Sequence, residues 1–242
     1  MERIMGILGG MGPLATVDFI QKIINATPAH SDQDHVPVIA ASLPQIPDRN
    51  DAIRGIGQSP LECMINIIRR LERAGAGAIA IPCNTAHFWH TALQHATPLP
   101  ILHIADAAID LMTSNGVSAG SRVGILATTS TLTEGIYRDR LNVRALNCIE
   151  PDDSIQEDYV MAGIRAVKAG DLSGGADMLA NAAAHLSRSG AEKIILACTE
   201  IPVALAHAGG HDPIYVDATD ALARACVKWA TSGDFTTVKQ VA

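Results

Sequence analysis

Short apolar runs alternate with helical patterns along most of the chain. Four strand-like runs are expected in each half of the sequence. They cover residues 4–8, 36–42, 78–82, 101–104, 122–127, 144–149, 194–197 and 214–216. Most of these runs are continuously apolar, which is typical of strands buried on both faces of a parallel sheet. The pattern therefore predicts an α/β fold.

The clearest helical pattern follows Ser59. Pro60 suits the first helical position, and Glu62 would complete a capping box with Ser59. Apolar residues then recur at helical spacing up to Gly75, which suits the end of a helix. These residues are Leu61, Met64, Ile65, Ile68 and Leu71.

The two halves of the sequence resemble each other. Cys83 and Cys198 lie 115 residues apart, each after an apolar run and each followed by Thr or Asn-Thr. Upstream residues recur at the same offset, namely Leu71, Arg73, Gly75 and Ala76 as Leu186, Arg188, Gly190 and Ala191. Runs 6–9 and 124–127, which open the two halves, also correspond. We expect two pseudo-symmetric, doubly wound domains with parallel four-stranded sheets.

The boundary between these domains is expected near the loop-like stretch 113–120. This gives an N-terminal α/β domain of residues 1–115 and a C-terminal α/β domain of residues 116–217. The final segment, 218–242, contains a helical pattern over 218–230. We expect this helix to pack back on the N-terminal domain.

Composition excludes several classes of partner. The net charge is −7, and no run of basic residues is longer than Arg69-Arg70, so nucleic acid and anionic membranes are not expected partners. No apolar stretch reaches membrane-spanning length and no signal peptide precedes the first strand, which favours the cytoplasm. The five cysteines are expected to be reduced thiols. Cys63, Cys148 and Cys226 have no repeat partner and are interpreted as packing residues.

Ligands of parallel sheets bind beyond the carboxyl ends of the strands. Cys83 and Cys198 both fall at such ends, as do the glycine loop 9–13, the run 128–131 and the segment after 36–42. Two matched thiols on opposite sides of one carbon form an acid and a base, which can move a proton across a stereocentre. Helix N-terminal amides lower the pKa of a thiol from about 8.5 towards neutrality, so we expect one thiolate and one thiol. Burial without a chemical role is the alternative for each cysteine.

Two other motifs admit competing interpretations. Residues 10–15 match G-x-G-x-x-A, but no acidic residue ends the second strand as a dinucleotide site requires. The loop suits a smaller anion such as a carboxylate, or holds structural turn glycines. Cys83, His87 and His90 have a spacing that could suggest zinc, but they supply three ligands at best, so no metal is expected. Arg49 on a proline-rich loop could bind a carboxylate, although alone it resembles a surface residue.

Taken together, the motifs resemble the aspartate/glutamate racemase superfamily, most closely its aspartate racemases. The matching segments are 6–16, 44–49, 82–87, 126–129, 163–170 and 198–200. The resemblance implies a homodimer with a cofactor-independent two-base mechanism, in which the active site lies in the cleft between two pseudo-symmetric domains. Neither pyridoxal phosphate nor a metal is expected.

The resemblance also implies roles for individual residues. Cys83 and Cys198 would be the catalytic acid and base. The groups that hold the α-carboxylate and ammonium would be Asn84, Thr85, Thr129 and Thr199. Arg49 and Lys168 would receive the side-chain carboxylate of aspartate. The further substrate-binding residues would be Met11, Gln45 and Glu200.

Departures from related families narrow the prediction. Gly10 and Glu200 stand where glutamate racemases carry an acidic residue and a histidine, which argues against glutamate. The intact cysteine pair argues against the single-thiol decarboxylases. We therefore predict racemisation of aspartate. The alternatives are a racemase of broader specificity, another two-cysteine isomerase, and a carboxylate-binding or redox-sensing protein without turnover.

Overall fold

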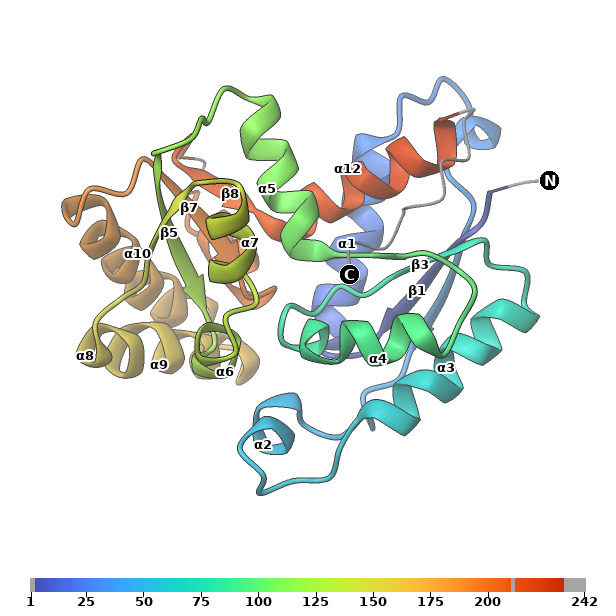
Figure 1. Cartoon of the computed structure of the whole chain (residues 1–242), viewed down its shortest axis with the longest axis horizontal. Helices are drawn as coiled ribbons and strands as arrows, with labels where there is room; N and C mark the ends of the chain where they lie inside the picture. Colours follow the sequence, from blue (N-terminus) through green and yellow to red (C-terminus); the bar gives the residue numbers. More distant parts are fainter. Residues whose placement is uncertain (1–2, 210–211, 233–242) are drawn as a thin grey trace.

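The computed structural model describes residues 3–209 and 212–232, and two four-stranded parallel sheets form its framework (Figure 1). The first sheet has the order β2-β1-β3-β4 and the second the order β6-β5-β7-β8. The strands of the first are β1 (Met5–Gly9), β2 (Val38–Ser42), β3 (Ala78–Ala80) and β4 (Ile101–Leu102). Those of the second are β5 (Arg122–Ala127), β6 (Asn147–Ile149), β7 (Lys193–Ala197) and β8 (Tyr215–Asp217). The prediction of two doubly wound α/β sheets is confirmed.

Helices cover both sheets. Those in the first half of the chain are α1 (Pro13–Ala26), α2 (Arg49–Ile53), α3 (Leu61–Arg73), α4 (His90–His95) and α5 (Ile104–Ser114). Those that follow β5 are α6 (Thr129–Thr133), α7 (Arg138–Val143), α8 (Asp153–Ile155), α9 (Ala162–Lys168), α10 (Leu172–Arg188), α11 (Glu200–His207) and α12 (Ala218–Thr231). Short helical turns add η1 (Asp32–Asp34), η2 (Thr85–Trp89) and the π-helical η3 (Gln156–Met161).

The predicted start of α3 is wrong by one residue. Pro60 is the N-cap and the helix begins at Leu61, whose amide donates to the Ser59 hydroxyl over 3.3 Å. Glu62 is therefore the second helical residue, so it cannot form the predicted capping box with Ser59. The predicted end is confirmed, because Gly75 takes the left-handed φ of +97° directly after the C-cap.

Four strands are shorter than predicted. β3 ends at Ala80, two residues early, and the other three are limited by local features. β2 begins only after Pro37, which has no amide hydrogen to donate. β4 ends before His103, whose ring accepts the Ala105 amide and caps α5. β6 begins after a turn in which Ala145 has a φ of 54°. Caps and turns thus compete with the apolar pattern at strand ends.

One hydrophobic core extends across both sheets. It includes Ile7 of β1 and Ile125 of β5, together with Phe19 of α1, Ile109 of α5 and Leu222 of α12. α12 packs against α1 and α5, both from the first half of the chain, and Figure 1 shows it crossing between the sheets. The rest of the predicted C-terminal segment, 233–242, lies outside the described residues.

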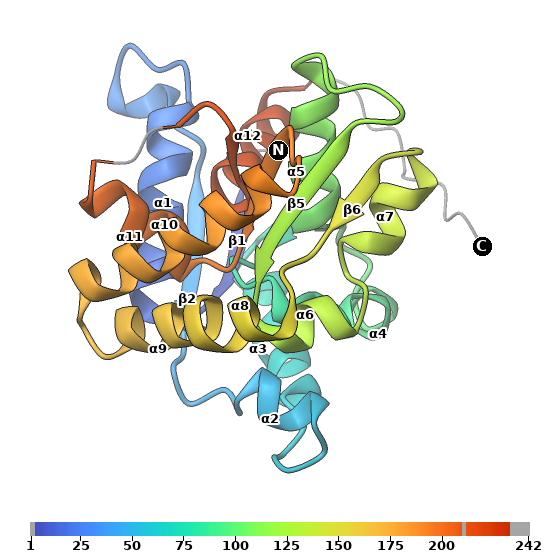
Figure 2. The same ribbon diagram turned by 90° about the vertical axis from the view of Figure 1, so that its left-hand side faces the viewer.

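The carboxyl ends of the central strands lead to one end of the molecule. α6, α8 and α9 of the second half lie there on the same side as α2 of the first half (Figure 2). The strands β1, β3, β5 and β7 run parallel to their neighbours, so the loops that follow them emerge at this end. This arrangement brings segments far apart in sequence to one place.

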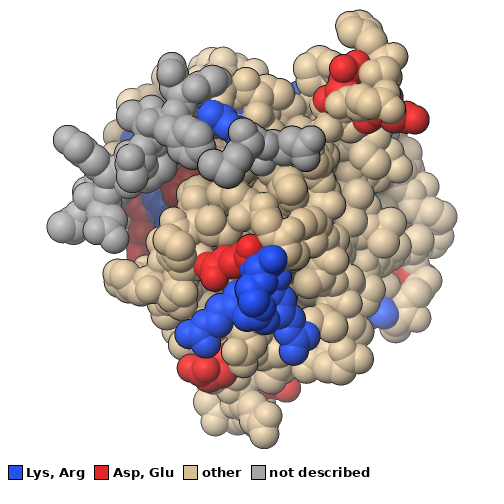
Figure 3. Space-filling model, turned by 90° about the vertical axis from the view of Figure 1, so that its right-hand side faces the viewer, with Lys and Arg blue, Asp and Glu red and all other residues tan. Residues whose placement is uncertain are grey.

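A local basic feature lies at the end of α3. Arg69, Arg70 and Arg73 are exposed on the last turns of α3, and Figure 3 shows basic side chains gathered on this face. Of the helices in the described residues, none combines the length and apolar character needed to cross a membrane.

Candidate active site

A small cavity open to solvent lies where the loops of the two sheets meet. Every site residue predicted from the sequence lines it except Gln45 and Thr129. The lining residues are Met11, Arg49, Asn50, Cys83, Asn84, Thr85, Thr128, Lys168, Cys198, Thr199 and Glu200. Both halves of the chain therefore contribute to a single site.

The two exceptions are exposed and do not line the cavity. Gln45 is exposed on the turn after β2. The exposed Thr129 donates its amide to the Met161 sulfur at 3.4 Å, and its hydroxyl accepts a hydrogen bond from Gln156. The preceding residue, Thr128, is buried and lines the cavity instead. A direct contact between ligand and Gln45 or Thr129 stays a prediction.

Cys83 is held by its own backbone. It follows β3 and donates its amide to the Ile81 carbonyl at 2.8 Å. Its carbonyl accepts a hydrogen bond from Nδ1 of His87, one turn later, at 2.9 Å. Its side chain is only 6% exposed, and it lines the cavity. The thiol is therefore presented from a fixed backbone.

The electrostatic environment of Cys198 favours the protonated thiol. Its thiol donates to Oε2 of Glu200 at 3.0 Å. Burial, and then the Glu200 carboxylate, raise the pKa of Cys198 well above its ordinary value, and Lys168 only partly opposes them. The Glu200 amide at the start of α11 does lower this pKa, as predicted, but desolvation and a neighbouring anion outweigh it. Cys198 is a protonated thiol near neutral pH.

Two cations border the cavity. Arg49 is only 9% exposed and donates from Nη1 to the carbonyls of Ile46 (3.3 Å) and Pro47 (3.1 Å). Its Nε is buried without a hydrogen-bond partner in the part of the chain that the structure describes. Arg49 is thus an internal residue, which its sequence context alone did not indicate.

Lys168 is the second cation. Its side chain is 42% exposed, and its Nζ lies 4.0 Å from Oε1 of Glu200. Burial lowers the pKa of Lys168, but the Glu200 carboxylate, with the thiolate forms of Cys198 and Cys83, raises it by more, so the pKa is raised overall. The ammonium is therefore charged at neutral pH and available to an anionic ligand.

Neutral polar groups complete the lining. The Asn84 carboxamide accepts a hydrogen bond at Oδ1 from the Tyr137 hydroxyl. Three threonine hydroxyls, those of Thr85, Thr128 and Thr131, lie 3.0 to 3.1 Å from one another. Thr85 follows β3 and the other two follow β5, so these contacts join the two halves at the cavity wall.

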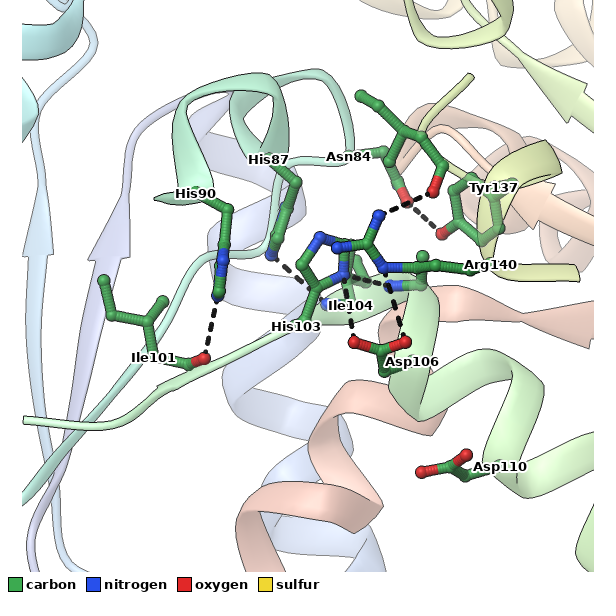
Figure 4. Close-up of polar contacts among 12 residues, drawn as sticks. Asn84, His87, His90, Ile101, His103, Ile104, Asp106, Asp110, Tyr137 and Arg140 are labelled. Carbon is green, nitrogen blue, oxygen red and sulfur yellow. Dashed lines mark hydrogen bonds and ion pairs between the residues drawn. The ribbon is translucent and has the colours of Figure 1, made fainter. Parts of the chain in front are cut away.

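His87, His90 and His103 cluster together (Figure 4). Both ring nitrogens of His87 are engaged, because Nε2 accepts the Ile104 amide at 3.2 Å while Nδ1 donates to Cys83. Burial, assisted by His90, lowers the pKa of His87 to about 3, so the ring is neutral. His87 is therefore unavailable as a metal ligand. Among residues 3–209 and 212–232, no group of three or more His, Cys, Asp or Glu is arranged to hold a metal ion.

Sequence reasoning missed three residues of this region: Asn50, Thr128 and Tyr137. The Thr128-Thr129-Ser130-Thr131 run offered a signal, because a threonine three residues before another can cap a helix. Thr128 does cap α6, with its hydroxyl accepting the Thr131 amide at 3.3 Å. Tyr137 carried no local signal.

Known proteins resemble this chain over most of its length. A broad-specificity amino-acid racemase of Bacillus subtilis, RacX, is 29% identical over 232 residues, covering 92% of this chain and 96% of the relative. The solved structure of an aspartate racemase from Picrophilus torridus has a TM-score of 0.81 and 34% identity, covering 94% of each chain. A glutamate racemase structure from Francisella tularensis, at 15% identity and a TM-score of 0.68, covers 94% of this chain and 81% of its own and shares the fold.

The match to a family is equally extensive. The family model for Asp/Glu/hydantoin racemases matches residues 8–226, which include both cysteine motifs and every residue that lines the cavity. The chain therefore belongs to the Asp/Glu/hydantoin racemase family.

Proposed function

We propose that this protein, an amino-acid racemase by family, interconverts L- and D-aspartate through two-base proton transfer between Cys83 and Cys198. The observation that carries the proposal is the cavity itself, where two buried thiols lie with two cationic side chains, Arg49 and Lys168. The thiols account for proton transfer at the α-carbon, and the cations account for a substrate with two carboxylates. The chemistry proposed uses neither pyridoxal phosphate nor a metal.

The charges around the two thiols favour different roles for them, one as acid and one as base. The Glu200 carboxylate accepts a hydrogen bond from the Cys198 S–H group and stabilises the protonated form of this thiol. Cys198 is therefore placed to give a proton to the α-carbon. In the same turnover Cys83, as thiolate, would take the α-proton from the opposite face. The reverse reaction exchanges the two roles.

The α-carbanion needs electrostatic stabilisation from the site. The Asn84 amide nitrogen is buried and has no hydrogen-bond partner in the described residues, so it can donate to the α-carboxylate. Nε of Arg49, also a buried donor without a partner within residues 3–209 and 212–232, is suited to the side-chain carboxylate instead. Such donors act strongly because the surrounding groups are buried and exclude water.

Broader specificity is a second candidate, and one observation favours it. A second cavity adjoins the first and shares Lys168, Thr199 and Glu200 with it. Its other walls are mostly apolar, formed by Leu14, Ala15, Val167 and Val203 among others. A larger, uncharged side chain could enter this space if Lys168 stayed paired with Glu200.

Solvent exchange tests the proposal. Purified protein is incubated with single enantiomers of a panel of amino acids in heavy water without pyridoxal phosphate, and loss of the α-proton is followed by NMR. We expect exchange with aspartate that is abolished by Cys83→Ala and by Cys198→Ala. Cys63→Ala, a thiol on α3 away from the cavity, is the matched control and should retain activity.

The outcome separates the candidates. No exchange with any amino acid, or exchange that survives both active-site substitutions, contradicts two-cysteine racemisation. Arg49→Leu should abolish exchange of acidic amino acids selectively. If neutral amino acids exchange faster than aspartate in the unmodified protein, the broader specificity is correct instead.

A further inference from the structure

We infer that Tyr137 is a positioning residue that orients the Asn84 carboxamide, so that Asn84 presents its N–H groups to a substrate carboxylate. The inference rests on the proposed function, because it concerns how the same site recognises its substrate. It assigns a role to a residue outside the cavity lining and outside every predicted motif.

The contact joins the two halves of the molecule. Asn84 follows β3, whereas Tyr137 lies in the connection that leads into α7. The Tyr137 hydroxyl donates to Oδ1 of Asn84 (Figure 4). Both residues are buried, with 3% exposure for Asn84 and 2% for Tyr137. The Tyr137 ring belongs to the core shared by both sheets, so the hydroxyl is held in place by packing.

A carboxamide has two different ends, and this contact decides which end faces the cavity. Oδ1 of Asn84 is taken by Tyr137, while Nδ2 is buried and makes no hydrogen bond in the described part of the chain. Asn84 also lines the cavity. A buried N–H group without an acceptor is costly, so this nitrogen is suited to an acceptor that arrives with the ligand.

The opposite orientation would reverse the site's preference. With the amide flipped, Oδ1 would face the cavity and repel a carboxylate. Nδ2 would then face Tyr137 and could donate a hydrogen bond to its oxygen. The phenol hydrogen, however, would lose its only acceptor within residues 3–209 and 212–232. Burial, chiefly, keeps the pKa of Tyr137 well above 10, so the phenol remains a donor at working pH.

A double-mutant cycle tests whether Tyr137 acts through Asn84. Tyr137→Phe keeps the ring and removes the hydroxyl. With the amino acid that the unmodified enzyme exchanges fastest, we expect kcat/KM to fall about tenfold or more, the range of a lost buried hydrogen bond. In an Asn84→Ala background the same change should alter kcat/KM less than twofold. Equal losses in both backgrounds would mean that Tyr137 has only a structural role, and would overturn the inference.

A second variant keeps the test independent of Tyr137 packing. Asn84→Asp retains an oxygen that can accept from Tyr137 but replaces the donor end with a second oxygen. We expect it to lose at least as much kcat/KM as Asn84→Ala, and wild-type activity in this variant would overturn the inference. Circular dichroism and urea midpoints of all variants establish that they are folded.

The two proposals fail differently. If the unmodified enzyme exchanges an amino acid but the cycle is additive, only the role of Tyr137 is refuted. If it exchanges no amino acid, the proposed function is refuted, and the cycle is measured on the dissociation constant of succinate, a dicarboxylate without an α-amine. Non-additive weakening of succinate binding supports the inference, and additive or absent weakening overturns it.

Discussion

The loop between β1 and α1 is confined by a close backbone approach that a single methyl group would disrupt. Gly10 has a φ of +94°, and a Cβ at this position would lie 2.4 Å from both N and C of Leu43. No rotamer change can relieve contact with backbone atoms. Gly116 has nearly the same φ, +95°, but a Cβ there would meet nothing within 4 Å. The two glycines therefore separate backbone strain from steric overlap.

The expected magnitudes follow from this difference. A left-handed conformation costs a non-glycine residue about 1–2 kcal/mol, offset by about 0.4–1 kcal/mol from the stiffer unfolded chain. Gly116→Ala should therefore reduce the free energy of unfolding by about 1 kcal/mol. Gly10→Ala adds overpacking of about 1–3 kcal/mol or more, because backbone must move. The displaced loop carries Met11, which lines the cavity, so kcat/KM should fall as well.

Equilibrium urea unfolding followed by circular dichroism measures both variants under one condition. We expect Gly10→Ala to be less stable than Gly116→Ala by about 2 kcal/mol or more, from the overlap alone. Equal stabilities, or a stabilised Gly10→Ala protein, would refute the argument that Leu43 backbone confines the loop.

Three further predictions concern charge and capping. The pKa of His87 is about 3 in the folded state and about 6.5 when unfolded, so between these values the unfolded chain binds one more proton. Lowering the pH from about 6.5 towards 3 should therefore reduce the free energy of unfolding by up to about 1.4 kcal/mol per pH unit from this residue. An NMR titration in which His87 ionises near 6.5 would contradict this. Glu200→Gln should lower the pKa of Cys198 by removing a neighbouring anion, detected as faster alkylation of Cys198 at pH 8 by mass spectrometry; an unchanged or slower rate would argue against this role. Asp48→Ala should cost about 1 kcal/mol, because the Asp48 carboxylate caps the helix that begins with Arg49, and a urea midpoint unchanged from the parent protein would show that the cap is dispensable.

The fold was predictable because its signals are local and repeated. Continuous apolar runs marked the strands, and the duplicated cysteine motifs marked equivalent strand ends. Strand limits were less predictable, since His103 and Ala145 act through caps and turns that compete with the apolar pattern. The start of α3 differed by one residue for the same reason.

The residues of the site that belong to sequence motifs were predictable, and those brought there only by the fold were not. Arg49 was recognised as a candidate, but its burial depends on carbonyls that its own loop turns inward. Thr129 was predicted and Thr128, which lines the cavity, was not, because a strand-to-helix turn changes the side-chain period and one residue decides which hydroxyl faces inward. Tyr137 acts on a partner 53 residues away, a contact that exists only in the folded chain.

The core shared by the two sheets has a consequence for the energetics of turnover. Two bodies joined by linkers can move apart cheaply, but separating these sheets would expose Ile109 and Leu222, which are completely buried between them. We therefore expect the low dielectric constant around the thiols to be established once, when the chain folds. Each catalytic cycle would then begin in an environment that already strengthens charge interactions, with no free energy spent on rebuilding it.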